Sequence, residues 1–271
     1  MSKITIKGRT LAIAVLSALA LPAQSHEFWI EPIKPSAPMS EKIAAHGRVG
    51  QGFKGEGHYY IPQDIKKLTA TDSNGTRDLK RTIGDFPIFE HLAKQPGLQI
   101  LSYVSTSTKL TYHKPGKFEK FLTNQGLLPV LQQHKKRGLP DTGFSEIFIR
   151  HAKALVNRGT PSGNDKKLGL LIELVAQQNP YKLQNTSVLP VKLFWKGAPL
   201  SNAQITIFQQ TTDDAIIRKI RTNQNGEANI PTKPGKTYML NAVKMTPKDA
   251  ANNIKWASHW ASLTFTVQVS P

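Results

Sequence analysis

The chain has 271 residues and no cysteine, which excludes a disulfide framework, thiolate metal sites and a cysteine nucleophile. This length accommodates one large domain or two ordinary ones. The formal net charge of +18 would attract polyanions such as nucleic acid or an anionic envelope surface. The basic residues nevertheless occur only in short groups such as Lys66-Lys67 and Lys135-Lys136-Arg137, which is typical of solvated faces.

Residues 1–25 have the pattern of a secretory signal peptide. Lys3, Lys7 and Arg9 form a positive start, residues 11–20 an apolar stretch, and Ala23-Gln24-Ser25 a small-residue cleavage motif. The apolar stretch is too short to span a bilayer, which takes roughly 20 apolar residues; a buried core helix is the alternative. We predict export to the periplasm, where there is no nucleic-acid partner to bind, and cleavage that leaves His26 at the mature N-terminus. A cut after residue 20 also follows small residues but would leave a leucine and a proline at the start.

Short apolar groups separated by glycine, proline and asparagine run through residues 26–115. They include residues 43–49, residues 68–71 before the turn Asp72-Ser73-Asn74-Gly75, and residues 98–104. Such groups predict short strands with frequent turns. We expect an N-terminal β-sandwich domain here.

Residues 116–160 predict a short helical segment. Phe118, Phe121 and Leu122 share one face of an expected helix over residues 117–128. In residues 144–156 the side chains with helical spacing are Ile147, Phe148, His151 and Leu155. We therefore predict two helices joined by a basic loop over residues 131–143.

Strands are predicted again over residues 161–271, after the linker Gly159-Thr160-Pro161-Ser162-Gly163-Asn164. Their expected ranges are 168–175, 188–195, 203–209, 216–222, 227–230, 236–244 and 262–269, with Asn223-Gln224-Asn225-Gly226 as a hairpin turn. Seven short strands with such turns are typical of an immunoglobulin-like or transthyretin-like sandwich. The expected fold is therefore mainly β, with two β-sandwich domains and a short helical segment between them.

Several blocks of the sequence together resemble a family of periplasmic proteins that carry a domain of unknown function, often labelled a nickel-uptake substrate-specific region (NikM-like). The resemblance covers nearly the whole chain after residue 25. The blocks begin with His26-Glu27-Phe28-Trp29-Ile30-Glu31-Pro32, continue with Phe118-Glu119-Lys120-Phe121-Leu122, Arg150-His151-Ala152-Lys153-Ala154-Leu155-Val156 and Gly197-Ala198-Pro199-Leu200, and end with Ser258-His259-Trp260-Ala261-Ser262-Leu263-Thr264-Phe265. The resemblance implies a periplasmic β-sandwich protein that handles a divalent transition metal, with the membrane component of a metal transporter as a possible partner.

His26 is the strongest candidate for a metal ligand. Once the signal peptide is removed, this residue offers two metal ligands, its free α-amine and its imidazole Nδ1. A third nitrogen from another histidine would complete the arrangement known as a histidine brace. Such nitrogen-rich sites favour Cu(II) or Ni(II), so we expect Ni or Cu as the bound metal. The alternative is that His26 is incidental and that its aromatic neighbours merely anchor the first strand.

Two further histidines are candidate ligands beside His26. His259 follows Trp256-Ala257-Ser258 just before the expected terminal strand, although a histidine between tryptophans is more often a packed core residue. His58 lies in the glycine-rich segment Gly55-Glu56-Gly57, although it could equally be an exposed loop residue. The predicted metal ligands are therefore His26, His259 and His58.

Motifs of catalysis are absent from the sequence, which has no Gly-x-Ser-x-Gly elbow, no His-Glu-x-x-His pair and no phosphate-binding Gly-x-x-x-x-Gly-Lys loop. We predict no catalytic and no cofactor-binding residues and expect a protein that is not an enzyme. Three functions stay open, in this order: metal binding or delivery, a copper-dependent oxidative enzyme, and a plain interaction or scaffold module.

Overall fold

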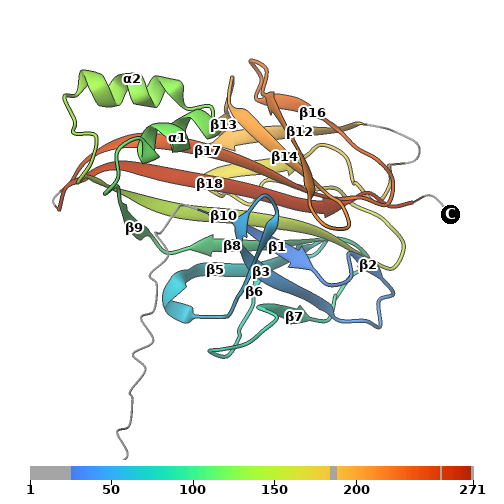
Figure 1. Ribbon diagram of the computed structural model, residues 1–271. Coiled ribbons are helices and arrows are strands. Elements are labelled where there is room, and N and C mark those ends of the chain that lie inside the picture. Colours follow the sequence, from blue (N-terminus) through green and yellow to red (C-terminus); the bar gives the residue numbers. More distant parts are fainter. Residues whose placement is uncertain (1–25, 184–187, 251, 270–271) are drawn as a thin grey trace, which may run out of the picture.

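The computed structural model describes residues 26–183, 188–250 and 252–269 (Figure 1). The predicted signal peptide lies outside these residues. Within them the fold is built from strands in three sheets with two short α-helices, which confirms the expected mainly β, sandwich-type fold. No helix in the described ranges is long and apolar enough to cross a bilayer.

The largest sheet runs through the middle of the molecule. Its strands lie in the order β15 (Ala215–Arg221), β14 (Gln204–Gln210), β17 (Thr237–Ala250), β18 (Ile254–Thr266), β10 (Ser145–Arg158), β8 (Gly97–Ser105), β5 (Ile65–Asp72) and β6 (Gly75–Asp78), and β2 (Ser36–Ala37) and β9 (Thr108–Thr111) also pair with β10. The strands β10 and β18 are parallel, whereas β17 pairs with β18 and β8 pairs with β10 in the antiparallel sense. The β10–β18 pair therefore joins the N-terminal and C-terminal parts of the chain.

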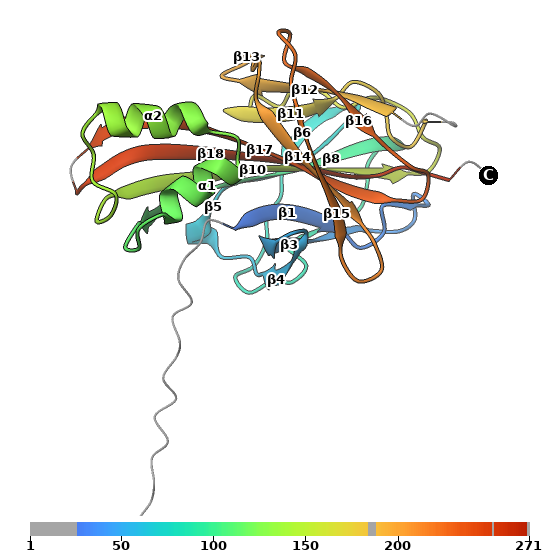
Figure 2. The same ribbon diagram turned by 45° about the horizontal axis from the view of Figure 1, so that its top comes forward.

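Two smaller sheets cover opposite faces of this large sheet (Figures 1 and 2). One contains β1 (Glu27–Pro32), β3 (Ile43–Gln51), β4 (Lys54–His58) and β7 (Phe89–His91), and the other contains β11 (Ile172–Ala176), β12 (Val188–Trp195), β13 (Ala198–Pro199) and β16 (Glu227–Pro231). A 3₁₀ turn, η1 (Pro62–Asp64), precedes β5.

The alternation of side chains along β10 separates the two cores, because successive residues of a strand point to opposite faces. Ala152 and Ala154 belong to the core beneath the β1 sheet. Leu155 belongs to the core beneath the β12 sheet. Both faces of the central strand are thus buried, and the two sandwich cores share the large sheet as a common wall.

Two helices, α1 (Lys117–Asn124) and α2 (Leu128–Lys136), cover one end of β17 and β18 (Figure 2). Phe118 and Leu122 of α1 pack with Trp256 and Trp260 of β18. This third cluster closes the end of the large sheet that the two smaller sheets leave open.

The helix predicted over residues 144–156 is wrong, because residues 145–156 belong to the strand β10. The predicted basic loop over residues 131–143 is also wrong in its first half, which continues the helix α2. The strand β10 is covered on both faces and mixes polar and apolar residues on each of them, so its sequence lacks the alternation of a strand with one exposed face. Ile147, Phe148, His151 and Leu155 have helical spacing by chance.

Candidate metal centre

The strand β1 begins one residue after His26, at Glu27. Phe28, Trp29 and Ile30 of this strand are all buried, and β1 pairs with β3 along its whole length. Apolar side chains project from both faces of β1, and their packing holds the strand between the large sheet and β3. The burial of Phe28, Trp29 and Ile30 therefore fixes the position of His26, which directly precedes this strand.

Arg150 of β10 holds the backbone of His26. Its Nη2 atom donates a hydrogen bond to the His26 carbonyl oxygen at 3.3 Å. Its guanidinium group lies 4.9 Å from the ring centroid of Phe148 and 5.8 Å from that of Phe28. Cation–π contacts at these distances help to keep the guanidinium in place. His26 itself is half-buried.

Glu27 places a carboxyl group directly after His26. Burial raises the pKa of this carboxyl to about 7, although backbone N–H groups of Glu27 and Gly52 partly offset the effect. Its Oε2 atom is buried without a hydrogen-bond partner. Sequence reasoning missed this acidic neighbour, since an isolated glutamate in a strand gives no signal of burial.

His58 lies at the end of β4 and its ring points into the N-terminal core. The ring meets Phe28 and Tyr103 edge-on, with centroid distances of 5.6 Å and 6.2 Å. Burial and, to a smaller extent, the nearby Arg150 lower the pKa of His58. The structure therefore places this histidine against packed aromatic rings rather than on an exposed glycine-rich loop.

His259 lies inside β18, which begins eight residues before the predicted terminal strand. Its register partners are Ile149 of β10 and Lys244 of β17. Its ring centroid is 5.9 Å from that of His151 and 5.1 Å from that of Trp195, the last residue of β12. His259 therefore faces the β12 sheet.

His26 and His259 lie on opposite faces of the large sheet. Arg150, which contacts His26, follows Ile149 on β10, and consecutive residues of a strand point to opposite faces. The register partner of His259 is Ile149, so its side chain points away from the face that carries β1. The expectation that His259 would serve as the third nitrogen beside His26 does not fit this geometry. In the described ranges, moreover, no three histidine or carboxylate side chains are grouped closely enough to hold a metal ion.

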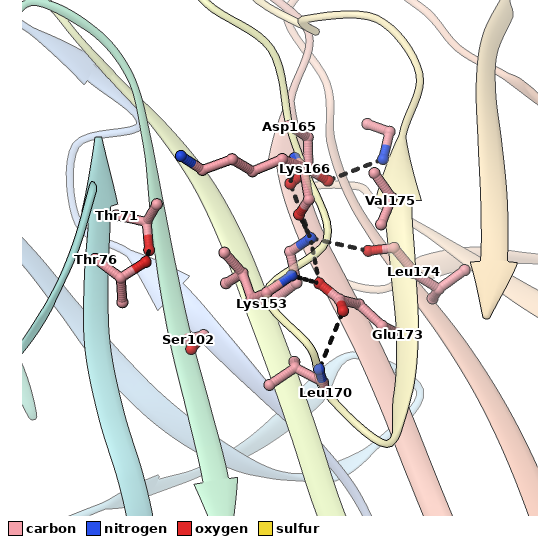
Figure 3. A network of polar contacts seen from close by, with 12 residues as sticks. Thr71, Thr76, Ser102, Lys153, Asp165, Lys166, Leu170, Glu173, Leu174 and Val175 are labelled. Carbon is pink, nitrogen blue, oxygen red and sulfur yellow. Dashed lines mark hydrogen bonds and ion pairs between the residues drawn. The ribbon is translucent and has the colours of Figure 1, made fainter. Parts of the chain in front are cut away.

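A buried ion cluster lies two residues along β10 from His151 (Figure 3). Lys153 Nζ lies 2.8 Å from Asp165 Oδ1 and 3.2 Å from Glu173 Oε1, and all three side chains are at most 2% exposed. The same ammonium donates to the carbonyl oxygens of Lys166 and Leu174.

The two carboxylates of this cluster are also occupied by backbone donors. Asp165 accepts from the amides of Lys166 and Ala176, and Glu173 accepts from those of Leu168 and Leu170. These contacts fasten the segment between β10 and β11 to the sheet. Since the oxygens already have partners, we interpret the cluster as structural. Sequence reasoning missed it because Lys153, Asp165 and Glu173 follow no common periodicity that would place them on one face of one element.

A further buried acid lies beneath the helices. Glu146 of β10 is fully buried, and this burial raises its pKa to about 8. Ser258 donates to Glu146 Oε1 at 3.3 Å and accepts from the indole N–H of Trp260 at 3.1 Å. At neutral pH this carboxyl is therefore protonated.

A family model described as a domain of unknown function (DUF4198) matches residues 23–246. No curated protein matches the chain. Among solved structures, the chain is similar to a Salmonella alpha-2-macroglobulin mutant, with 9% identity and a TM-score of 0.23 over 95% of this chain and 16% of that one. It is also similar to the BSP domain of a biofilm-associated protein, with 11% identity and a TM-score of 0.19 over 89% of this chain and 30% of that one. The chain thus spans less than a third of either structure, and TM-scores this low do not show a shared fold.

Proposed function

The chain belongs to the DUF4198 family, a domain of unknown function, and we propose that it binds or delivers a divalent transition metal. Ni, Co and Cu are the candidate metals, and the mature N-terminal residue His26 is the proposed ligand. The proposal includes export to the periplasm, because cleavage after Ser25 is what frees the α-amine.

The fixed position of His26 is the observation that supports this proposal. Its carbonyl is held by Arg150 and its successors are buried, so the α-amine and the imidazole would project from an ordered strand. An α-amine has an ordinary pKa of about 7.7 to 8.0, and a metal ion readily displaces its proton near neutral pH. Amine and imidazole nitrogens suit Cu and Ni.

The remaining ligands are water or groups of a partner protein in this proposal. His259 is left out because it lies on the other face of the large sheet, and the ring of His58 packs against Phe28 and Tyr103. A site with few protein ligands fits delivery better than storage, because a partner can take over the metal by ligand exchange. The membrane component of a metal transporter is a partner of this kind, and the basic surface would favour an anionic envelope surface nearby.

Isothermal titration of the mature protein with Cu(II), Ni(II) and Zn(II) tests the proposal, with the N-terminus confirmed as His26 by mass spectrometry. We expect one-to-one binding of Cu(II) or Ni(II) with a Kd below about 1 μM. The variant His26→Ala should lose this binding, whereas the control His113→Ala, at an exposed position, should retain it. Equal affinity of wild type and His26→Ala would show that the N-terminal residue is not the ligand.

A further inference from the structure

A pair of buried histidines lies on the face of the large sheet that is opposite to His26. His151 of β10 and His259 of β18 belong to neighbouring parallel strands, in which Ile149 pairs with His259 and His151 pairs with Ala261. The two rings are therefore offset by one step along the same face, and their centroids are 5.9 Å apart with an interplanar angle of 30°. His151 is 5% exposed and His259 is 7% exposed.

Three ring nitrogens of this pair have no hydrogen-bond partner. They are both nitrogens of His151 and Nδ1 of His259, and all three are buried. The contrast with His134, a histidine 2% exposed, is informative. Its Nδ1 accepts from the indole of Trp256 and its Nε2 lies 3.0 Å from the carbonyl oxygen of Pro140. His134, which packs beneath the helices, thus has a partner at both ring nitrogens, whereas His151 has a partner at neither.

Leaving a buried polar group without a partner costs about 1–3 kcal/mol. Such groups in folded proteins commonly mark the place of an ion or a water molecule. Two adjacent imidazoles, each with a free nitrogen, form a pair of donors that a single ion can satisfy. With metal–nitrogen bonds of about 2 Å, the two donor atoms would lie about 4 Å apart. The rings are stacked with their centroids 5.9 Å apart, so a rotation of the imidazoles would bring one nitrogen of each to this separation.

We propose that His151 and His259 form a second metal site that binds one Cu(I) ion between their imidazoles. The site is separate from His26 and does not depend on the function proposed for it. Burial lowers the pKa of each imidazole to about 4, aided by His259 and Lys66 for His151 and by Lys248 and Lys196 for His259. Metal binding requires the neutral form of an imidazole.

The surroundings of the pair favour a monovalent ion. No carboxylate completes a group of three ligands with these histidines among the described residues, whereas Zn(II) sites are almost always four-coordinate and hard divalent cations prefer oxygen ligands. The lysines that lower the two pKa values also repel a cation, and a double charge more than a single one. Cu(I) carries a single charge and accepts two nitrogen ligands.

Anaerobic competition against a chromophoric Cu(I) chelator tests the proposal, with the mature protein in a His26→Ala background so that the N-terminal site is removed. We expect one Cu(I) ion per chain in this background. His151→Gln and His259→Gln should each weaken this binding by at least about tenfold, and His113→Gln should leave it unchanged. Retention of the full affinity in either variant of the pair would overturn the proposal. So would Zn(II) binding that competes equally with Cu(I).

A measurement without substitutions in the pair guards against variants that merely fail to fold. Ag(I) serves as a redox-inert monovalent probe, and the ¹⁵N resonances of the histidine rings report its ligands. We expect one nitrogen of His151 and one of His259 to shift on addition of one equivalent of Ag(I), and those of His134 to stay. Unchanged resonances of the pair would mean that water alone occupies the site. Because this test uses the His26→Ala background, its failure leaves the proposal for His26 standing, and the reverse also holds.

Discussion

The Nη2 atom of Arg150 lies 3.3 Å from the backbone oxygen of His26. The contact joins the central strand β10 to the residue that precedes β1, across 124 positions of the sequence. The same guanidinium rests against the rings of Phe148 and Phe28. A side chain anchored in the middle of the fold thereby fixes the backbone that carries the proposed metal ligands.

Replacing Arg150 should weaken metal binding at His26 without removing a ligand. The variant Arg150→Met keeps the apolar contacts with Phe148 and Phe28 but cannot donate to the His26 carbonyl. The N-terminal residue then has to be ordered on binding, at a cost of about 0.5–1.5 kcal/mol, which corresponds to a roughly two- to tenfold higher Kd. Titration calorimetry with Cu(II) measures this effect, and an unchanged Kd would show that the contact does not organise the site.

The buried ion cluster around Lys153 should dominate the stability of the β10–β11 region. Lys153→Met leaves Asp165 and Glu173 buried without their cation, and we expect a loss of about 3–5 kcal/mol in the free energy of unfolding. The matched control is Lys34→Met, since Lys34 and Glu41 form an exposed pair with side chains 60% and 39% exposed. That change should cost less than about 1 kcal/mol. Denaturant unfolding measures both values, and equal losses would refute the assigned role of Lys153.

Glu146 should make the protein less stable as the pH rises towards 8. Burial keeps this carboxyl protonated in the folded chain up to a pKa of about 8, against an ordinary value of 4.5. Between these two values the folded state holds a proton that the unfolded state has released, so the free energy of unfolding falls with increasing pH. Glu146→Gln has no such proton, and its stability relative to wild type should increase from pH 5 to pH 8.

Thermal or denaturant unfolding at several pH values tests this dependence on Glu146. The control Glu119→Gln, at an exposed position of α1, should follow the wild-type curve. A constant difference between Glu146→Gln and wild type over this pH range would mean that the buried carboxyl is already ionised at pH 5.

The fold class could be predicted because strands covered on one face alternate in the sequence and end at recognisable turns. The range predicted as 188–195 coincides with β12, and the expected turn at residues 223–226 precedes β16. The strand β10 could not be recognised, because burial on both of its faces removes the alternation. The predicted strand over residues 262–269 covers only the last five residues of the long β18, since Trp256 and Trp260 pack beneath helices that no local pattern connects to this strand.

Of the candidate sites, too, the sequence predicts one and leaves the other unrecognised. His26 could be predicted as a metal ligand because cleavage of the signal peptide alone adds a free α-amine to its imidazole. This prediction does not depend on tertiary structure. The pairing of His151 with His259 depends on the parallel register of β10 and β18, which joins residues 108 positions apart and leaves no local signal in the sequence. No pattern in the sequence relates His259 to His26, and in the structure the neighbour of His259 is His151.

The most direct test of the central claim compares the Cu(II) and Ni(II) affinities of the mature protein with a free α-amine and of the same protein with an acetylated N-terminus. Acetylation removes one proposed ligand and leaves every side chain in place. We predict that the acetylated protein binds at least about tenfold more weakly. Equal affinities of the two forms would contradict the claim that the α-amine of His26 binds the metal.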